Sequence, residues 1–139
     1  MPEVAGLPEP GAEVYRAAAE LRTALRTFVR RSEQLARAQG LTPQQYVLLL
    51  LIKGSPDGRE RATVTDLSRR LQLGQSTVTE LVQRAEDAGL IERALDRADA
   101  RVSWLSLTPT GNARLAAVVR DVGPERRRLF ELLATLDVD

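Results

Sequence analysis

The stretch from Thr63 to Gly111 constrains the fold of this chain more than any other. It starts with a short amphipathic helical pattern, passes through the turn LQLG, and takes up a second helical pattern from about Gln75 to Ala88. Two strand-like segments follow, Leu90–Leu95 and Val102–Leu107, with the polar sequence DRADAR between them. Helix, tight turn, helix and hairpin, in this order, predict a winged helix-turn-helix, whose second helix fits the major groove of DNA.

Helical patterns also lie on both sides of this stretch. Residues 12–39 carry a seam of apolar side chains spaced alternately by four and three. The seam suits packing on the domain's own core or on another chain, and the length of the helix favours another chain for part of it. The seam consists of Val14, Ala18, Leu21, Leu25, Phe28 and Leu35, with Ser32 in its one polar position.

Capping sequences mark where several helices begin. Thr42 to Gln45 combine a capping hydroxyl, a proline at the first helical position and a glutamine that completes a capping box. Thr63 and Asp66 repeat the pattern before the next helix. Pro109 opens a helix after the hairpin, and Gly123-Pro124 is expected to kink or break it.

These segments define a mainly α fold with a small β-hairpin wing. Residues 12–139 are expected to form a single domain, with a winged-helix lobe at 41–108 and dimerisation helices at 12–40 and 109–139. Residues 1–11, rich in proline and glycine, are expected to form a flexible lead.

Composition excludes several kinds of function. The 139 residues include no cysteine and no histidine, which removes disulfides, thiol sensing, the usual zinc ligands and His-dependent nucleophiles. The longest apolar run, Tyr46 to Ile52, is too short to span a membrane, and the N-terminus lacks a signal-peptide pattern. We therefore expect a cytoplasmic protein that is not an enzyme, with no cofactor, metal or membrane partner.

Charge gives no bulk sign of nucleic-acid binding. The net charge is +1, and acidic side chains equal the arginines in number between Arg59 and Arg101. The basic residues are arginines except for Lys53. Arginine has a planar fork that suits phosphates and base edges, although a genomic bias in composition explains the excess equally well. An interface with DNA must therefore be argued from where the charges lie.

The second helix opens with small polar residues, as a helix must if its backbone is to approach the bases. Glutamine can bind adenine with two hydrogen bonds, and hydroxyls can bind bases or phosphates. The alternative is that serine and threonine merely cap the helix, but one cap does not require four polar residues. The candidate base-reading residues are Gln75, Ser76, Thr77 and Thr79, with Arg84 further along the helix.

The hairpin tip supplies the candidate wing contacts. Arg101 is the stronger candidate for insertion into the minor groove, and Arg97 is a candidate phosphate contact. Asp99 can either orient Arg101 or pair with Arg84. Taken alone, this tip also fits an ordinary solvated turn.

Jointly, the motifs LTPQQYVLL, TVTDLSRRLQLGQSTVTELVQRAEDAGLIER, DRADAR and LSLTPTG resemble the multiple antibiotic resistance regulator (MarR-type) family of transcription factors. The resemblance covers Leu41 to Gly111, about half of the chain. It implies a homodimer of winged helices on a pseudo-palindromic operator in double-stranded DNA. It also implies repression relieved by a small phenolic or lipophilic effector bound between the dimerisation and DNA-binding parts.

The chain departs from the family pattern in places. Ala85 and Ala98 replace larger residues, and the last helix of the family has only Asp137 to Asp139 left to it. The form of the dimer is the expectation most affected. The alternative function is a winged helix that binds a protein partner and no DNA. Phe28, Tyr46 and Trp104 could line an effector pocket, but core packing explains them at least as well.

Overall fold

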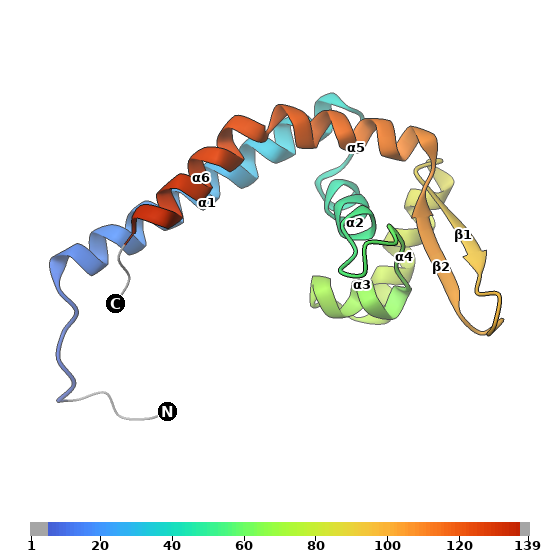
Figure 1. Ribbon diagram of the computed structural model, residues 1–139, viewed down its shortest axis with the longest axis horizontal. Helices are drawn as coiled ribbons and strands as arrows, with labels where there is room; N and C mark the ends of the chain where they lie inside the picture. The colour runs from blue at the N-terminus through green and yellow to red at the C-terminus, as the bar shows by residue number, and fades with distance from the viewer. Residues whose placement is uncertain (1–5, 137–139) are drawn as a thin grey trace. The chain divides into compact units, whose positions relative to one another are not determined.

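The computed structural model describes residues 6–136, which contain six helices and two strands (Figure 1). They form two compact units, one of residues 6–31 together with 122–136 and one of residues 32–121. The elements are α1 (Ala12–Ala38), α2 (Pro43–Lys53), α3 (Val64–Leu71), α4 (Gln75–Asp87), β1 (Ile91–Leu95), β2 (Ser103–Leu107), α5 (Pro109–Asp121) and α6 (Gly123–Thr135).

The unit of residues 32–121 is built around α2. This helix is apolar on nearly every side, and Leu48, Leu49 and Ile52 are almost fully buried. Leu67 of α3 and Val78 of α4 close the same core from the helix-turn-helix. Capping boxes at the starts of α2 and α3 use the residues expected from the sequence. The capping boxes and the burial of apolar side chains therefore indicate the same positions for α2 and α3.

The hairpin is antiparallel, with Ile91 opposite Leu107 and Leu95 opposite Ser103. A third segment joins β2 through an isolated bridge in which the main chain of Ala62 exchanges two hydrogen bonds with Leu105, at 3.0 and 2.8 Å. This bridge ties the loop between α2 and α3 to the wing.

The root of the wing is packed against the start of α5. The backbone amide of Thr108 donates to the carbonyl oxygen of Leu90 at 3.0 Å, and the Thr108 hydroxyl donates to the carbonyl oxygen of Gly89 at 2.6 Å. Gly111, one turn into the new helix, lies so close to Leu90 that a Cβ atom would overlap the Leu90 carbonyl oxygen. A glycine at this position lets α5 pass directly over the junction between α4 and β1.

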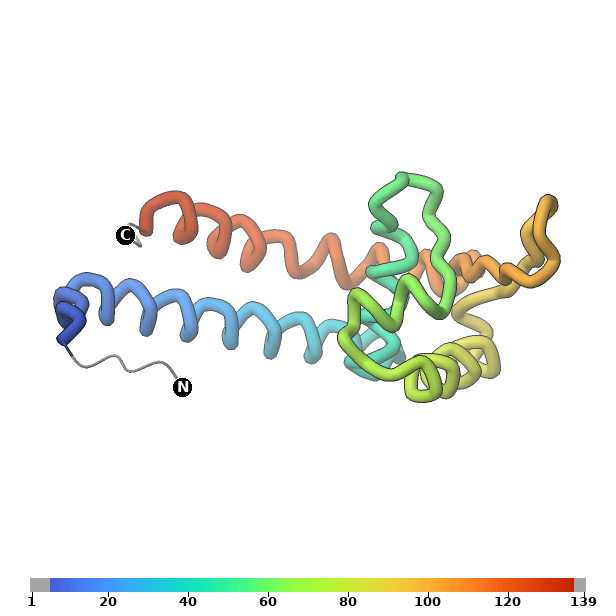
Figure 2. The backbone as a smooth tube through the Cα atoms, turned by 90° about the horizontal axis from the view of Figure 1, so that it is seen from below, coloured from blue at the N-terminus to red at the C-terminus, as the bar shows by residue number. Residues whose placement is uncertain are grey.

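The other unit pairs the first part of α1 with α6, which lie side by side (Figures 1 and 2). An ion pair of 3.7 Å between Arg31 and Glu125 links them. The apolar seam of α1 is only partly covered in this unit, because Leu25 remains 40% exposed and Ala18 is exposed. Several other large apolar side chains of the unit are also exposed, namely Tyr15, Val29, Phe130 and Leu133.

Most expected boundaries agree with the structure to within one residue. The break expected at Gly123-Pro124 falls at Val122, which separates α5 from α6. Helical spacing predicts that Leu81 packs into the core beside Val78 and Val82 of α4, but it is only half-buried. Part of the expected flexible lead and the final Asp137 to Asp139 lie outside the described residues. Within residues 6–136, no helix is both long enough and apolar enough to cross a membrane.

Candidate nucleic-acid interface

The turn between α3 and α4 sets the direction of the second helix. Gln72 ends α3 in the left-handed conformation, with φ 58° and ψ 41°, which few residues other than glycine adopt readily. The backbone amide of Leu73 donates to the Ser68 carbonyl oxygen at 3.2 Å, and the Ser68 hydroxyl donates to the Leu73 carbonyl oxygen at 2.5 Å. These bonds hold the turn while Val78 and Val82 anchor α4 in the core.

The start of α4 is open to solvent. Its N-cap is Gly74, so the cap is not one of the hydroxyl residues that follow, and the capping explanation of these residues is wrong. Ser76, Thr77 and Thr79 are exposed, and their side chains make no hydrogen bond within residues 6–136. Gln75 is also exposed and donates from Nε2 to the Thr65 hydroxyl at 3.2 Å. In the part of the chain that the structure describes, uncapped amides and unpaired hydroxyls thus lie together at the exposed start of α4.

Arg84 lies in the last turn of α4, away from this open start. Its Nη2 atom is 2.8 Å from Glu80 Oε1, and both side chains are about two-thirds exposed. Of the two partners considered for Asp99, Arg84 is therefore wrong. Acidic partners accompany the arginines on this face, so charge alone does not favour nucleic acid over another partner.

The wing turn is organised by Asp96. Its Oδ2 atom accepts hydrogen bonds from the backbone amides of Ala98 and Asp99, both at 3.0 Å. Its Oδ1 atom accepts a hydrogen bond of 2.9 Å from the indole Nε1 of Trp104. These donors favour the ionised carboxylate, with the Trp104 bond the largest contribution, and hold the pKa of Asp96 below its ordinary value of 3.8.

Asp99 orients Arg101, as one of the two expectations had it. The guanidinium donates from Nε and Nη2 to the two carboxylate oxygens, at 3.0 and 3.1 Å, and the Arg101 amide adds a third bond of 3.0 Å. The side-chain bonds, more than the backbone bond, lower the pKa of Asp99. The Arg101 side chain remains 90% exposed, and Arg97 is exposed on the same tip. The tip therefore presents an arginine that is oriented and accessible.

The contacts of Arg61 and Trp104 in this region were not predicted from the sequence. The guanidinium carbon of Arg61 lies 3.8 Å from the centre of the Trp104 ring, a cation–π contact between the α2–α3 loop and the wing. The Trp104 indole also binds Asp96, which places the ring outside the main core. Tyr46 is 7% exposed and belongs to the core, as the simpler explanation of the aromatic residues expected.

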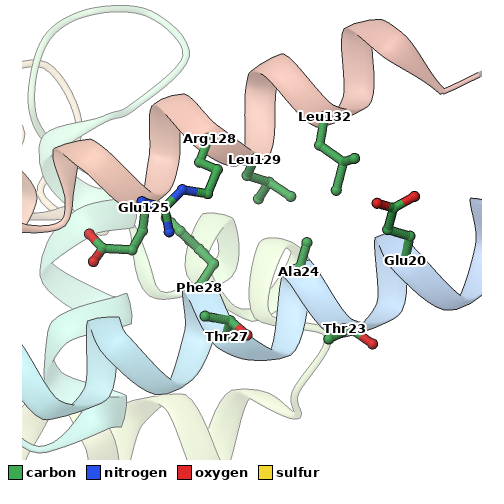
Figure 3. Close-up of a pocket in the computed structure, with 9 residues that line it drawn as sticks. All are labelled: Glu20, Thr23, Ala24, Thr27, Phe28, Glu125, Arg128, Leu129 and Leu132. Atoms are coloured by element: carbon green, nitrogen blue, oxygen red, sulfur yellow. The ribbon is translucent and has the colours of Figure 1, made fainter.

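A separate groove lies within the unit of α1 and α6. Its volume is about 400 Å³, and apolar side chains such as Leu129 and Leu132 of α6 point toward the side of α1 that carries Phe28 (Figure 3). Its remaining lining residues are Glu20, Thr23, Ala24, Thr27, Glu125 and Arg128.

Taken together, the turn, the open helix start and the wing define a winged helix-turn-helix protein. The sequence profile of the MarR family matches residues 39–102. The chain is 30% identical, over 73% of its length and 66% of the other, to the uncharacterised HTH-type transcriptional regulator YsmB of Bacillus subtilis. The chain thus spans about two thirds of the length of that relative. It belongs to the MarR family.

Solved structures agree in fold. A crystal structure of the MarR family transcription regulator SP03579 matches 86% of this chain and 76% of its own, with a TM-score of 0.70 and 28% identity. A point mutant of MepR from S. aureus, solved bound to an oligodeoxyribonucleotide, matches 86% of this chain and 83% of its own. The TM-score is 0.64 and the sequence identity is 23%, so this match shows a similar fold.

Proposed function

We propose that this protein is a sequence-specific DNA-binding transcriptional regulator. The start of α4 reads bases in the major groove, and Arg101 of the wing enters the flanking minor groove. The observation that carries the proposal is the exposed start of α4, where the side chains of Ser76, Thr77 and Thr79 have no hydrogen-bond partner among residues 6–136 and the first backbone amides have no side-chain cap. Such a turn offers donors to phosphates and bases without first breaking internal bonds.

Family membership supports this proposal. MepR, which shares the fold, was solved with an oligodeoxyribonucleotide, and YsmB carries the name of a transcriptional regulator. The charges neither support nor oppose the proposal, because Glu80 pairs with Arg84 on α4 and Asp99 pairs with Arg101 on the wing. The alternative, a winged helix that binds only proteins, has no comparable observation in its favour.

The test is a fluorescence-anisotropy titration with a labelled duplex from the region flanking the protein's own gene, against a random duplex of equal length. We expect preference for the flanking duplex and an affinity that falls steeply with salt, as phosphate contacts require. Arg101→Ala should weaken binding by about tenfold, the loss of one good groove contact. Equal binding of the two duplexes would refute sequence-specific recognition.

Arg37→Ala provides the matched control for this variant. Arg37 is also an exposed arginine in an ion pair, with Glu33 at 3.6 Å, but it lies near the end of α1 rather than on the wing. Arg37→Ala lowers the net charge by the same amount as Arg101→Ala. Because an exposed ion pair contributes little to stability and Arg37 lies away from the wing, DNA affinity should stay within about twofold of wild type. A similar loss in both variants would indicate general electrostatics instead of a wing contact.

The protein is further proposed to act as a homodimer on a pseudo-palindromic operator. The exposed apolar side chains of the α1–α6 unit, among them Phe130 and Leu133, support this state because water-exposed apolar patches mark association surfaces. Light scattering should give twice the chain mass of 15.3 kDa. Leu133→Lys should shift the mass toward the monomer, whereas Ala134→Lys, at the neighbouring exposed position, should not.

The proposal also includes an effector, a small lipophilic or phenolic molecule whose binding releases the protein from DNA. Adding simple phenolic acids to the same titration should weaken binding of the flanking duplex, at ligand concentrations that leave the random duplex unaffected. An affinity that is constant across the ligand series would refute release by phenolic acids. Cytoplasmic localisation accompanies the proposed function.

A further inference from the structure

Trp104 occupies an unusual place for a tryptophan on a hairpin. It is half-buried on β2, opposite Ala94, and lies outside the main core cluster. One end of the indole donates its only N–H to Asp96, and the ring carries the guanidinium of Arg61 at 3.8 Å. Arg61 is itself placed by the neighbouring bridge of Ala62 to β2. The large ring therefore connects the α2–α3 loop to the wing turn.

Asp96 links the Trp104 indole to the backbone of the wing turn. One of its carboxylate oxygens is held by Trp104, while the other holds the backbone amides of Ala98 and Asp99. The Asp96 amide also donates to the Val102 carbonyl oxygen at 2.9 Å, which closes the hairpin. With the indole in place, the carboxylate cannot rotate away without losing three hydrogen bonds.

Arg101 lies at the end of this chain of contacts. Asp99, whose amide is bound by Asp96, uses its own side chain to hold the Arg101 guanidinium through two bonds. The set of Arg61, Trp104, Asp96 and Asp99 is here called the wing bracket. Each member contacts the next, and only the last contacts Arg101.

We propose that Trp104 and Asp96 are positioning residues that preorganise the wing for its contact with DNA through Arg101. The inference rests on the proposed function and deepens it. An exposed hairpin tip loses conformational entropy when it docks in a groove, and a tip that is already ordered loses less. The bracket thus raises affinity without adding a charge or a direct contact.

The test uses Trp104→Phe in the full-length protein. Phenylalanine keeps an aromatic ring under Arg61 and removes the indole N–H that binds Asp96. We expect about a three- to tenfold loss of affinity for the flanking duplex, the net contribution of one typical hydrogen bond. Ser106→Ala, which removes a polar group from the same strand outside the bracket, is the control and should bind as wild type does.

A double-mutant cycle separates positioning from general damage. In an Arg101→Ala background, Trp104→Phe should cause no further loss, because the bracket acts through Arg101. An equal loss in both backgrounds would overturn the proposal. Asp96→Ala leaves the Trp104 ring unchanged, so it guards against a packing defect at the ring, and it should repeat the pattern of Trp104→Phe.

Amide hydrogen exchange in the free protein distinguishes failure of the bracket from failure of the proposed function. Exchange at Ala98 and Asp99 should accelerate about tenfold in Trp104→Phe, since their common acceptor loses its anchor. If the wild type binds DNA but exchange at Ala98 and Asp99 is unchanged in Trp104→Phe, the positioning role of the bracket is refuted. Absence of DNA binding by the wild type overturns the proposed function, and accelerated exchange would then still establish the conformational part of the bracket.

Discussion

The start of α4 and the tip of the wing present polar groups to solvent in opposite ways. Ser76 and Thr77 carry side chains without a hydrogen-bond partner among the described residues 6–136, on a turn that is positioned by helix geometry and by buried residues such as Val78. Arg101 sits on a hairpin tip and is held by side-chain bonds to Asp99. The helix start is thus ordered by its backbone, whereas the wing is ordered by its side chains.

The difference has a physical origin. A helix anchored in a core has a rigid backbone, so short side chains on it are already well placed and need no internal partner. A hairpin tip has few buried contacts, and a long arginine on it would otherwise sample many rotamers. Changes at the helix start should therefore act on binding alone, while changes around the wing should act first on conformation.

The largest effect should come from a charge placed at the helix start. Ser76→Glu should weaken DNA binding by at least about a hundredfold, because a carboxylate then faces the phosphates and base edges. The same carboxylate favours the positive end of the α4 dipole, so stability should stay equal or rise slightly. Anisotropy titration and urea unfolding of one sample measure both quantities.

Thr110→Glu is the matched control for this charge. Thr110 is also exposed and lies in the first turn of a helix, α5, outside the proposed DNA-reading surface. It should bind DNA within about threefold of wild type, the effect of a single added charge at a distance. If Ser76→Glu lost both binding and stability, the helix start would not be the independent surface described above.

A smaller effect should follow from disturbing the junction between the two regions. Gly111→Ala places a methyl group on the carbonyl oxygen of Leu90, between the end of α4 and the start of β1. We expect a loss of about 1–3 kcal/mol in the free energy of unfolding, the usual cost of overpacking. Thermal unfolding should show a fall of several degrees.

Gly74→Ala serves as the comparison for that loss, since nothing among the described residues lies within 4 Å of a Cβ atom at this position. It should cost less than about 1 kcal/mol, through the weaker N-cap alone. Equal losses in the two variants would mean that the tight passage of α5 over Leu90 does not limit stability.

The smallest effect should be the response of the wing to acid. Asp96 and Asp99 both have a pKa below the ordinary value of 3.8 in the folded protein. Their bonds therefore contribute fully above pH 3.8 and are lost as the pH falls through the lowered folded values. Carboxyl carbon NMR should show both groups titrating below pH 3.8, with disorder appearing at the wing tip before the start of α4. If the wing tip and the start of α4 became disordered at the same pH, the wing would not be ordered separately by its side-chain bonds.

Much of this fold could be predicted because its signals are local. The capping boxes at Thr42 and Thr63 use residues three positions apart, and the burial of Val78 and Val82 follows helical spacing. The turn before α4 was also recognisable, although the left-handed conformation falls on Gln72 rather than on the glycine that follows.

The side-chain partners could not be predicted in the same way. The sequence offered Asp99 two arginine partners, and in the structure it binds Arg101 while Arg84 pairs with Glu80. The contact of Arg61 with Trp104 joins residues far apart in sequence through the bridge of Ala62 to β2. Such partners follow from tertiary packing, which no local pattern records.

The position of Trp104 has one practical consequence. It is the only tryptophan in the chain, and it lies on the wing beside the side chains of Arg61 and Asp96. Its ultraviolet emission therefore reports the state of the wing without any label. A shift in that emission when a duplex is added would detect engagement of the wing in real time, separately from contacts made by the start of α4.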